Sequence, residues 1–153
     1  GDPLKGSGVF PKVEYKKQEV KKRIDRVKQE HAEILDLTNC GLTSIPKEVF
    51  QLNGLKTLIL GKCYNDKDVI KHRNYIVEIA EGIKNLTNLR TLDLSGNALA
   101  TLPIELEALN HLNTLVLQQN QFRKIPSVVY KLHFNLKNLD FSGVLAFAKS
   151  EFS

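Results

Sequence analysis

The chain has 153 residues, and its 22 Lys and Arg against 17 Asp and Glu give a formal charge of +5 with neutral histidines. This length fits one domain, and no apolar run approaches the roughly 18 residues that a membrane-spanning helix needs. With 42% hydrophobic and 25% charged residues, the composition excludes a disordered or fibrous chain. Because the chain contains no Met, we expect Gly1 to be an added residue or an internal position of a longer protein.

The positive charge is concentrated near the start of the chain. Residues 12–31 carry eight basic and four acidic residues, a charge of +4, and the remaining 14 basic and 13 acidic residues leave +1. Two interpretations stand: a cap whose polar face meets solvent, or a basic helix that binds nucleic acid. We favour the cap, because acidic residues dilute the charge and no aromatic residues are interleaved for stacking.

The first two predicted segments are a lead-in and a helix. Residues 1–12 hold three Gly and two Pro, which is typical of a flexible lead-in. Residues 13–31 contain neither, and Val20, Ile24 and Val27 recur at helical spacing, with His31 extending the line. The pattern predicts an amphipathic N-terminal cap helix over 13–31.

The rest of the chain, about residues 32–143, repeats one pattern of buried aliphatic residues. The pattern L-x-x-L-x-L-x-x-N-x-L begins at Leu89 and again at Leu112, an offset of 23 residues. A fixed period in the range of roughly 20–29 residues with this core indicates a stack of structural repeats. The two copies match at nine positions each: Leu89, Leu92, Leu94, Asn97, Leu99, Leu102, Pro103, Leu106 and Leu109, then Leu112, Leu115, Leu117, Asn120, Phe122, Ile125, Pro126, Val129 and Leu132.

This pattern resembles the leucine-rich repeat family, in the 23-residue form common in bacterial and intracellular proteins, with Pro after the fourth core position. The resemblance implies an α/β fold, a right-handed β-α superhelix of about five parallel strands with a helical N-terminal cap. It also implies a non-catalytic scaffold for protein–protein interaction.

The repeats are predicted to be interrupted once. Repeat one places Cys40 where later copies have Asn, and repeat two, starting at Leu55, places Cys63 there. Leu55 and Leu89 are 34 residues apart, which is 11 more than the period, so we predict an insertion near 64–74. It is either a tolerated surface bulge or a rim segment that contacts a partner. Residues 144–153 are expected to form a C-terminal cap or a truncated end. The contact candidates of the insertion are Tyr64, Lys71, His72 and Arg73.

Alternate strand residues should line the concave face of the sheet. The predicted middle row alternates acidic and apolar residues, which is either ordinary scatter or a mixed contact surface. The candidate partner-binding residues are Asp36, Ile59, Thr91, Asp93, Ser95, Thr114, Val116, Gln118 and Asp140.

We find no pattern for catalysis, a metal or a cofactor. The spacing of Asp66, Asp68 and His72 fits no known metal-binding loop, and no phosphate-binding loop occurs. Two cysteines in equivalent repeat positions are expected to be reduced and buried, which favours the cytoplasm but leaves secretion or the cell surface open. We expect a monomer that binds a protein partner. The alternative is a sensory or adaptor segment of a larger enzyme, such as a Roco-type GTPase or a ubiquitin ligase effector.

Overall fold

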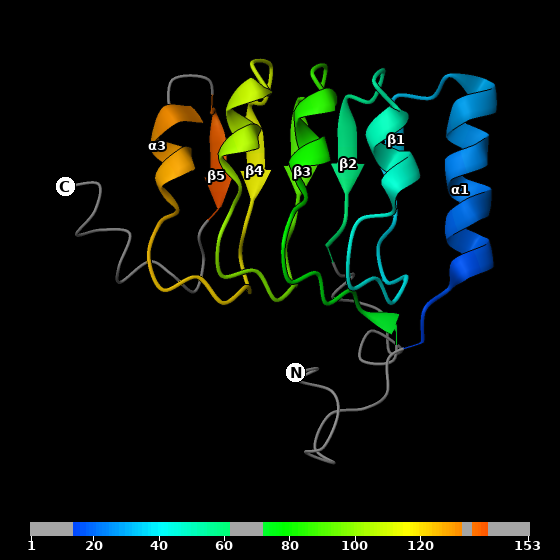
Figure 1. Cartoon of the computed structure of the whole chain (residues 1–153), viewed down its shortest axis with the longest axis horizontal. Coiled ribbons are helices and arrows are strands. Elements are labelled where there is room, and N and C mark those ends of the chain that lie inside the picture. Colours follow the sequence, from blue (N-terminus) through cyan, green and yellow to red (C-terminus); the bar gives the residue numbers. More distant parts are fainter. Residues whose placement is uncertain (1–13, 62–71, 133–135, 141–153) are drawn as a thin grey trace, which may run out of the picture.

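The computed structural model describes residues 14–61, 72–132 and 136–140, apart from the side chains of Asn138 and Asp140. These residues form one parallel sheet whose five strands follow chain order, with a helix alongside the first strand (Figure 1). The predicted right-handed superhelix of about five parallel strands is therefore confirmed. The helix and the strands are α1 (Lys17–Glu30), β1 (Ile34–Asp36), β2 (Thr57–Ile59), β3 (Thr91–Asp93), β4 (Thr114–Val116) and β5 (Asn138–Asp140).

The register of the sheet follows directly from the repeat period. Leu58 pairs with Leu92, and Leu92 pairs with Leu115, so equivalent leucines of successive repeats stack as neighbours. Each of these three side chains is fully buried, while the residues before and after it on the strand are partly exposed. A shift by one residue would turn every leucine to the solvent, which is why the register is well specified.

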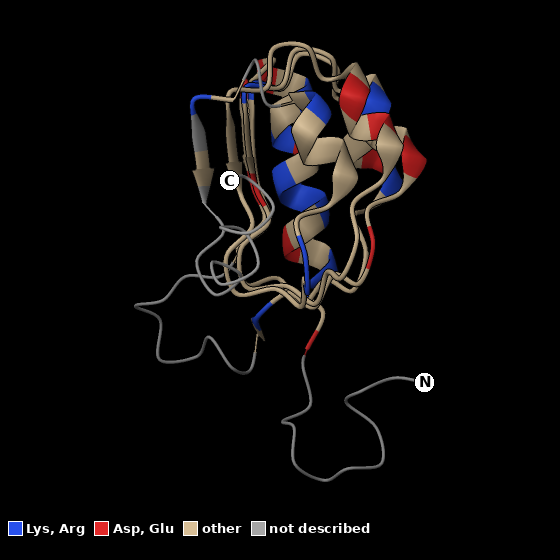
Figure 2. Ribbon diagram, turned by 90° about the vertical axis from the view of Figure 1, so that its left-hand side faces the viewer, with Lys and Arg blue, Asp and Glu red and all other residues tan. Residues whose placement is uncertain are grey.

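The return side of each repeat differs from the predicted α-helix. Three of the four described returns are 3₁₀ helices, and only the last is α-helical. Five residues are too few for a stable α-helical turn with its caps, whereas 3₁₀ bonds close after three residues; Val49 N–H donates to the carbonyl of Pro46 at 3.0 Å, for example. Figure 2 shows these helices as a second layer against the sheet. They are η1 (Lys47–Gln51), η2 (Glu81–Asn85), η3 (Ile104–Ala108) and α3 (Ser127–Leu132).

A column of buried asparagines holds the repeats together. Asn97 donates from Nδ2 to the carbonyl oxygens of Leu60 at 3.0 Å, Leu94 at 3.1 Å and Ser95 at 3.3 Å. Its Oδ1 accepts the N–H of Ile76 at 3.0 Å. One side chain therefore satisfies backbone groups of its own repeat and of the repeat before it, which would otherwise be buried without partners.

Asn74 makes corresponding hydrogen bonds one repeat earlier, which corrects the predicted assignment of the asparagine position of repeat two. Its Nδ2 donates to the carbonyl of Leu37 at 2.9 Å and that of Leu60 at 3.0 Å. Its Oδ1 accepts the N–H of Leu42 at 2.8 Å and that of Cys40 at 3.2 Å. The bonds to Leu37, Leu60 and Leu42 are the equivalents of those that Asn97 makes to Leu60, Leu94 and Ile76.

Asn74 therefore holds the asparagine position of repeat two that the sequence analysis gave to Cys63. Cys63 itself lies outside the described residues. The extra residues fall between Gly61 and Asn74, which overlaps the predicted region near 64–74 but leaves Asn74 outside the insertion. Counting from the asparagines reveals this, since 97 − 74 = 23 restores the undisturbed period.

Helix α1 covers the open edge of the sheet at β1. Val20, Ile24 and Val27 are buried, as their spacing predicts. In a parallel sheet, alternate backbone groups of the first strand face away from the second strand and need another partner. Arg23 supplies one by donating from Nη1 to the carbonyl of Asp36 at 2.8 Å.

His31 does not extend the buried line of α1 as predicted. It is exposed, and its backbone adopts the left-handed conformation that ends the helix, with φ of 49°. A left-handed residue after the last turn redirects the chain, so the side chain at 31 leaves the apolar face that Val20, Ile24 and Val27 define.

The residue before the asparagine position has a positive φ in three described repeats. Gly96 holds this position before Asn97 with φ of 65°, and Gln119 holds it before Asn120 with φ of 57°. Gln119→Gly should raise the free energy of unfolding by about 0.5–1 kcal/mol, because glycine adopts this conformation without steric cost. Urea unfolding measures the gain. Asn39→Gly is the control and should not gain stability, since Asn at φ of 53° tolerates the conformation and Asn39 is buried and has an interaction of its own. An equal gain in both variants would contradict the explanation.

Candidate functional site

The exposed face of the sheet, which we call the strand face, presents its side chains in ordered rows. Cα pairing joins Ile34, Thr57, Thr91, Thr114 and Asn138 in the first row. The same pairing joins Asp36, Ile59, Asp93, Val116 and Asp140 in the middle row. The structure thus brings the predicted residues of both rows together on adjacent strands, about 4.8 Å apart.

The acidic residues of the middle row are fixed by short bonds to the following turn. Asp36 Oδ1 accepts the N–H of Thr38 at 2.9 Å and also its hydroxyl, and Asp93 Oδ1 accepts the N–H of Ser95 at 2.9 Å. Among the described residues, neither carboxylate has a basic side chain within ion-pair distance. The turn bonds hold both carboxylates in place, and the charge of Asp36 also interacts with the nearby Arg23 guanidinium.

The apolar residues between them remain accessible. Ile59 and Val116 are partly exposed, and Ile34 in the first row is 61% exposed. Thr91, Thr114 and Gln118, three other predicted contact residues, are likewise partly exposed. The strand face therefore combines aliphatic surface, hydroxyls and fixed carboxylates.

Ser95 is the exception among the predicted contact residues. Ser95 is only 2% exposed, because it lies close over Gly61, which follows β2 in the neighbouring repeat. A Cβ at position 61 would sit 2.4 Å from Ser95 Oγ and 2.8 Å from Asp93 Oδ1. Ser95 is therefore a packing residue rather than a contact surface. Two residues beyond the middle row lies a third row, formed among the described residues by Thr38, Gly61, Ser95 and Gln118, and this row is low at Gly61 and Ser95. The sequence signal was the pair of small residues in equivalent positions.

The insertion candidates are divided by the structure. Tyr64 and Lys71 lie outside the described residues. His72 is partly buried, and Arg73 donates from Nη2 to the carbonyl of Gly96 at 2.9 Å. The Arg73 guanidinium also lies 4.0 Å from the ring centre of Tyr75, a cation–π contact. Arg73 thus joins two repeats of the stack.

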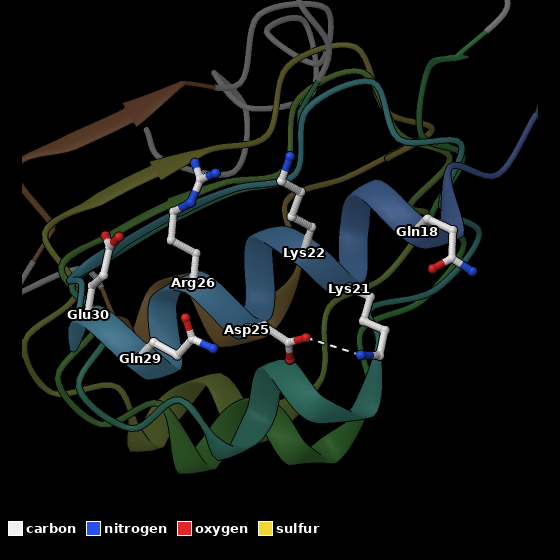
Figure 3. Close-up of a pocket in the computed structure, with 7 residues that line it drawn as sticks. All are labelled: Gln18, Lys21, Lys22, Asp25, Arg26, Gln29 and Glu30. Carbon is white, nitrogen blue, oxygen red and sulfur yellow. Dashed lines mark hydrogen bonds and ion pairs between the residues drawn. The ribbon is translucent and has the colours of Figure 1, made fainter.

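The outer surface of α1 is mixed in charge. A hollow of about 410 Å³ there is lined by residues of this one helix (Figure 3). Lys21 pairs with Asp25 at 3.2 Å, and Arg23 pairs with Glu19 at 2.9 Å, which lowers the Glu19 pKa through the hydrogen bond from Arg23 and its charge. These pairs reduce the free positive charge that a nucleic-acid backbone would need. The expectation that nucleic acid does not bind stays a prediction.

The described residues contain one buried free thiol and no candidate metal cluster. Within 14–61, 72–132 and 136–140 no group of three or more His, Cys, Asp or Glu side chains could hold a metal ion. No helix in that part of the chain has the length and apolarity to cross a membrane. Cys40 is a buried free thiol. Burial raises the pKa of this thiol, against an opposing effect of the nearby Arg23 guanidinium.

The buried thiol predicts a specific loss of stability at alkaline pH. Because the folded state favours the protonated thiol, the contribution of Cys40 is full below the ordinary thiol pKa of 9.0 and declines as pH rises through the higher folded pKa. The stability difference between the parent protein and Cys40→Ala should therefore shrink from pH 7 to pH 10 in urea unfolding. A difference that stays constant would show that Cys40 ionises equally in both states.

Known proteins share this repeat architecture in sequence as well as in structure. Residues 87–130 match the family described as Leucine Rich repeats (2 copies), and residues 31–52 match the family described as Leucine Rich Repeat. The chain is a leucine-rich repeat protein. The expected family is confirmed, and the matched segments bracket the insertion.

This leucine-rich repeat chain is similar to solved structures of longer leucine-rich repeat proteins. A leucine-rich repeat protein of Leptospira interrogans is 28% identical with a TM-score of 0.52, over 76% of this chain and 33% of its own. A chain of the BIR3–SERK2 complex from Arabidopsis thaliana is 28% identical with a TM-score of 0.54, and the match covers 70% of this chain and 53% of that chain. The leucine-rich repeat domain of the type III effector XopL is 19% identical with a TM-score of 0.62, and the match covers 80% of this chain and 40% of that chain. This similarity supports the fold alone. The chain thus spans about a third to a half of the length of these proteins.

Proposed function

We propose that this leucine-rich repeat stack is a non-catalytic scaffold that binds a protein partner on the strand face. The observation that carries the proposal is the middle row, in which Asp36, Ile59, Asp93 and Val116 stand in register on four adjacent strands. Binding surfaces of proteins combine accessible aliphatic area with charges that select the partner. A row roughly 20 Å long suits a protein segment better than a small molecule, which favours an enclosed pocket.

The comparisons support this proposal at the level of the family. One of the similar structures is itself a complex of two proteins. The family resemblance implies an interaction scaffold.

Site-specific photo-crosslinking tests the proposal. A photoreactive amino acid placed at Val116 should form a crosslink to a discrete partner in lysate of the source cells. The matched control is the same amino acid at Ile104, a 61% exposed apolar residue of η3 on the return side. Unlabelled parent protein should compete for the partner. Crosslinks of equal yield at both positions, or none at Val116, would reject the strand face as the binding surface.

The second candidate is that the repeats serve as the sensory or adaptor part of a larger protein. It is favoured by the coverage, since the chain matches only 33% to 53% of the structures above. Sequencing the complete reading frame tests it. An adjoining catalytic domain would support this candidate, and a frame that encodes the repeats alone would reject it.

A further inference from the structure

The strand face carries a charge opposite to that of the whole molecule. The charged residues of the first and middle rows are all acidic in the sequence, namely Asp36, Asp93 and Asp140, although the chain as a whole has a formal charge of +5. Among the described residues neither the Asp36 nor the Asp93 carboxylate forms an ion pair, although Arg23 lies near Asp36 and interacts with its charge. Charge complementarity therefore calls for a cationic partner at this face.

The spacing of the row restricts the shape of that partner. Acidic and aliphatic residues alternate at each strand: Asp36 is followed by Ile59, then Asp93, then Val116. Strands lie about 4.8 Å apart, so a partner lying across them must alternate cationic and apolar groups at about 4.8 Å.

Among regular backbones, an α-helix meets this spacing. It rises 1.5 Å per residue, so residues three and four apart advance along one face by about 5.3 Å on average. Over four strand steps the helix advances about 21 Å and the row about 19 Å, a difference that a flexible Lys side chain can absorb. In an extended strand, side chains on one face recur about every 6.6 Å, which matches neither the spacing between neighbouring residues of the row nor the spacing between its acidic residues. A polyproline helix repeats about every 9.3 Å, which meets the acidic residues alone.

The relief of the strand face leaves room for such a helix. In the third row Gly61 has no side chain and Ser95 is buried. The surface beside the centre of the middle row is therefore low, so a helix of about 10 Å diameter can approach the carboxylates closely.

We propose that the strand face binds a cationic amphipathic helix, with Lys or Arg seven residues apart over the acidic positions and an aliphatic residue midway over Ile59 and Val116. This inference rests on the proposed function, because it names the partner class of the same face. It goes further by fixing the sign of the charge, the backbone and the period of the partner.

A designed peptide tests the inference without knowledge of the natural partner. The probe is a fluorescent, Ala-rich helical peptide of about 18 residues, with Lys every seven residues and Leu three and four residues after each Lys. Two comparison peptides share its composition: one with the Lys and Leu positions permuted, and one whose helix is broken by proline in place of a central Ala. Fluorescence anisotropy should show saturable binding of the probe that weakens with added salt, and about tenfold weaker binding of both comparison peptides.

Two matched variants locate the binding. Asp36→Asn with Asp93→Asn removes two charges but keeps an oxygen that accepts the turn N–H groups, so folding is preserved. This double variant should bind the probe peptide about 5- to 10-fold more weakly than the parent protein does. Glu78→Gln with Glu81→Gln removes two charges from exposed residues at and before η2 on the return side and should leave binding unchanged.

Each other outcome has a definite meaning. Equal binding of the permuted peptide, equal loss in the Glu78/Glu81 control, or no binding of the probe overturns the inference. If the natural partner still crosslinks at Val116 in that case, the proposed function stands and only the helical partner is rejected. If no crosslink forms at Val116 either, the proposed function fails as well.

Discussion

Asn97→Ala is expected to lower the free energy of unfolding by about 3–5 kcal/mol, among the largest effects of any single change in this chain. The side chain is 3% exposed and contacts four backbone groups on two repeats. Alanine leaves those groups buried, and water cannot replace the amide without opening the stack. Each unsatisfied group costs about 1–3 kcal/mol, reduced where the backbone relaxes.

The measurement is the urea midpoint and slope, followed by circular dichroism. Asn88→Ala is the control, because Asn88 is exposed and donates a single hydrogen bond, to the carbonyl of Asn53 at 2.8 Å. It should cost less than about 1 kcal/mol. Equal losses in the two variants would mean that the buried asparagines do not hold the repeats together.

Gly41→Ala is expected to release the cap, with a loss of about 3 kcal/mol or more. Two separate constraints act at this position. Gly41 has φ of +69°, which strains any residue with a Cβ. That Cβ would also lie 2.0 Å from the carbonyl oxygen of Glu14 and 2.9 Å from Tyr15 Cα, which are backbone atoms that cannot rotate away. The segment entering α1 must then move, and the bond from Lys16 N–H to the carbonyl of Cys40 at 3.0 Å breaks.

Hydrogen exchange separates this local release from global unfolding. Amides of α1 should lose protection in Gly41→Ala before those of β3 and β4 do. Gly54→Ala is the control, since a Cβ at Gly54 meets nothing within 4 Å. If α1 keeps its protection in Gly41→Ala, the close approach at Gly41 does not control how the cap docks.

The stacked leucines were predictable, because each strand buries one side chain in three and the period places those positions on top of one another. Leu58, Leu92 and Leu115 follow from counting alone. The same counting assigned the asparagine position of repeat two to Cys63 instead of Asn74, since it started from the strand leucines and continued through residues that belong to no repeat. Asn74 shows that the period must also be counted backwards from the following asparagine, Asn97.

The strand face was predictable in register but not in relief. Alternation along a strand assigns a side to each residue, but exposure on that side depends on the neighbouring strand. Ser95 is buried because Gly61 opposite it lets the chains approach. The 3₁₀ returns are a similar case, since aliphatic spacing reports which residues face the core and is nearly the same in short α and 3₁₀ segments.

The affinity of the crosslinked partner for two lysine variants tests most directly whether the strand face is the recognition surface. Val116→Lys replaces an aliphatic residue of the middle row with a cation, and Ile104→Lys makes the same kind of change on the return side. We predict that Val116→Lys weakens binding at least tenfold with an unchanged unfolding midpoint, while Ile104→Lys binds like the parent protein. Unchanged affinity in Val116→Lys, or an equal loss in Ile104→Lys, would contradict the assignment of partner binding to the strand face.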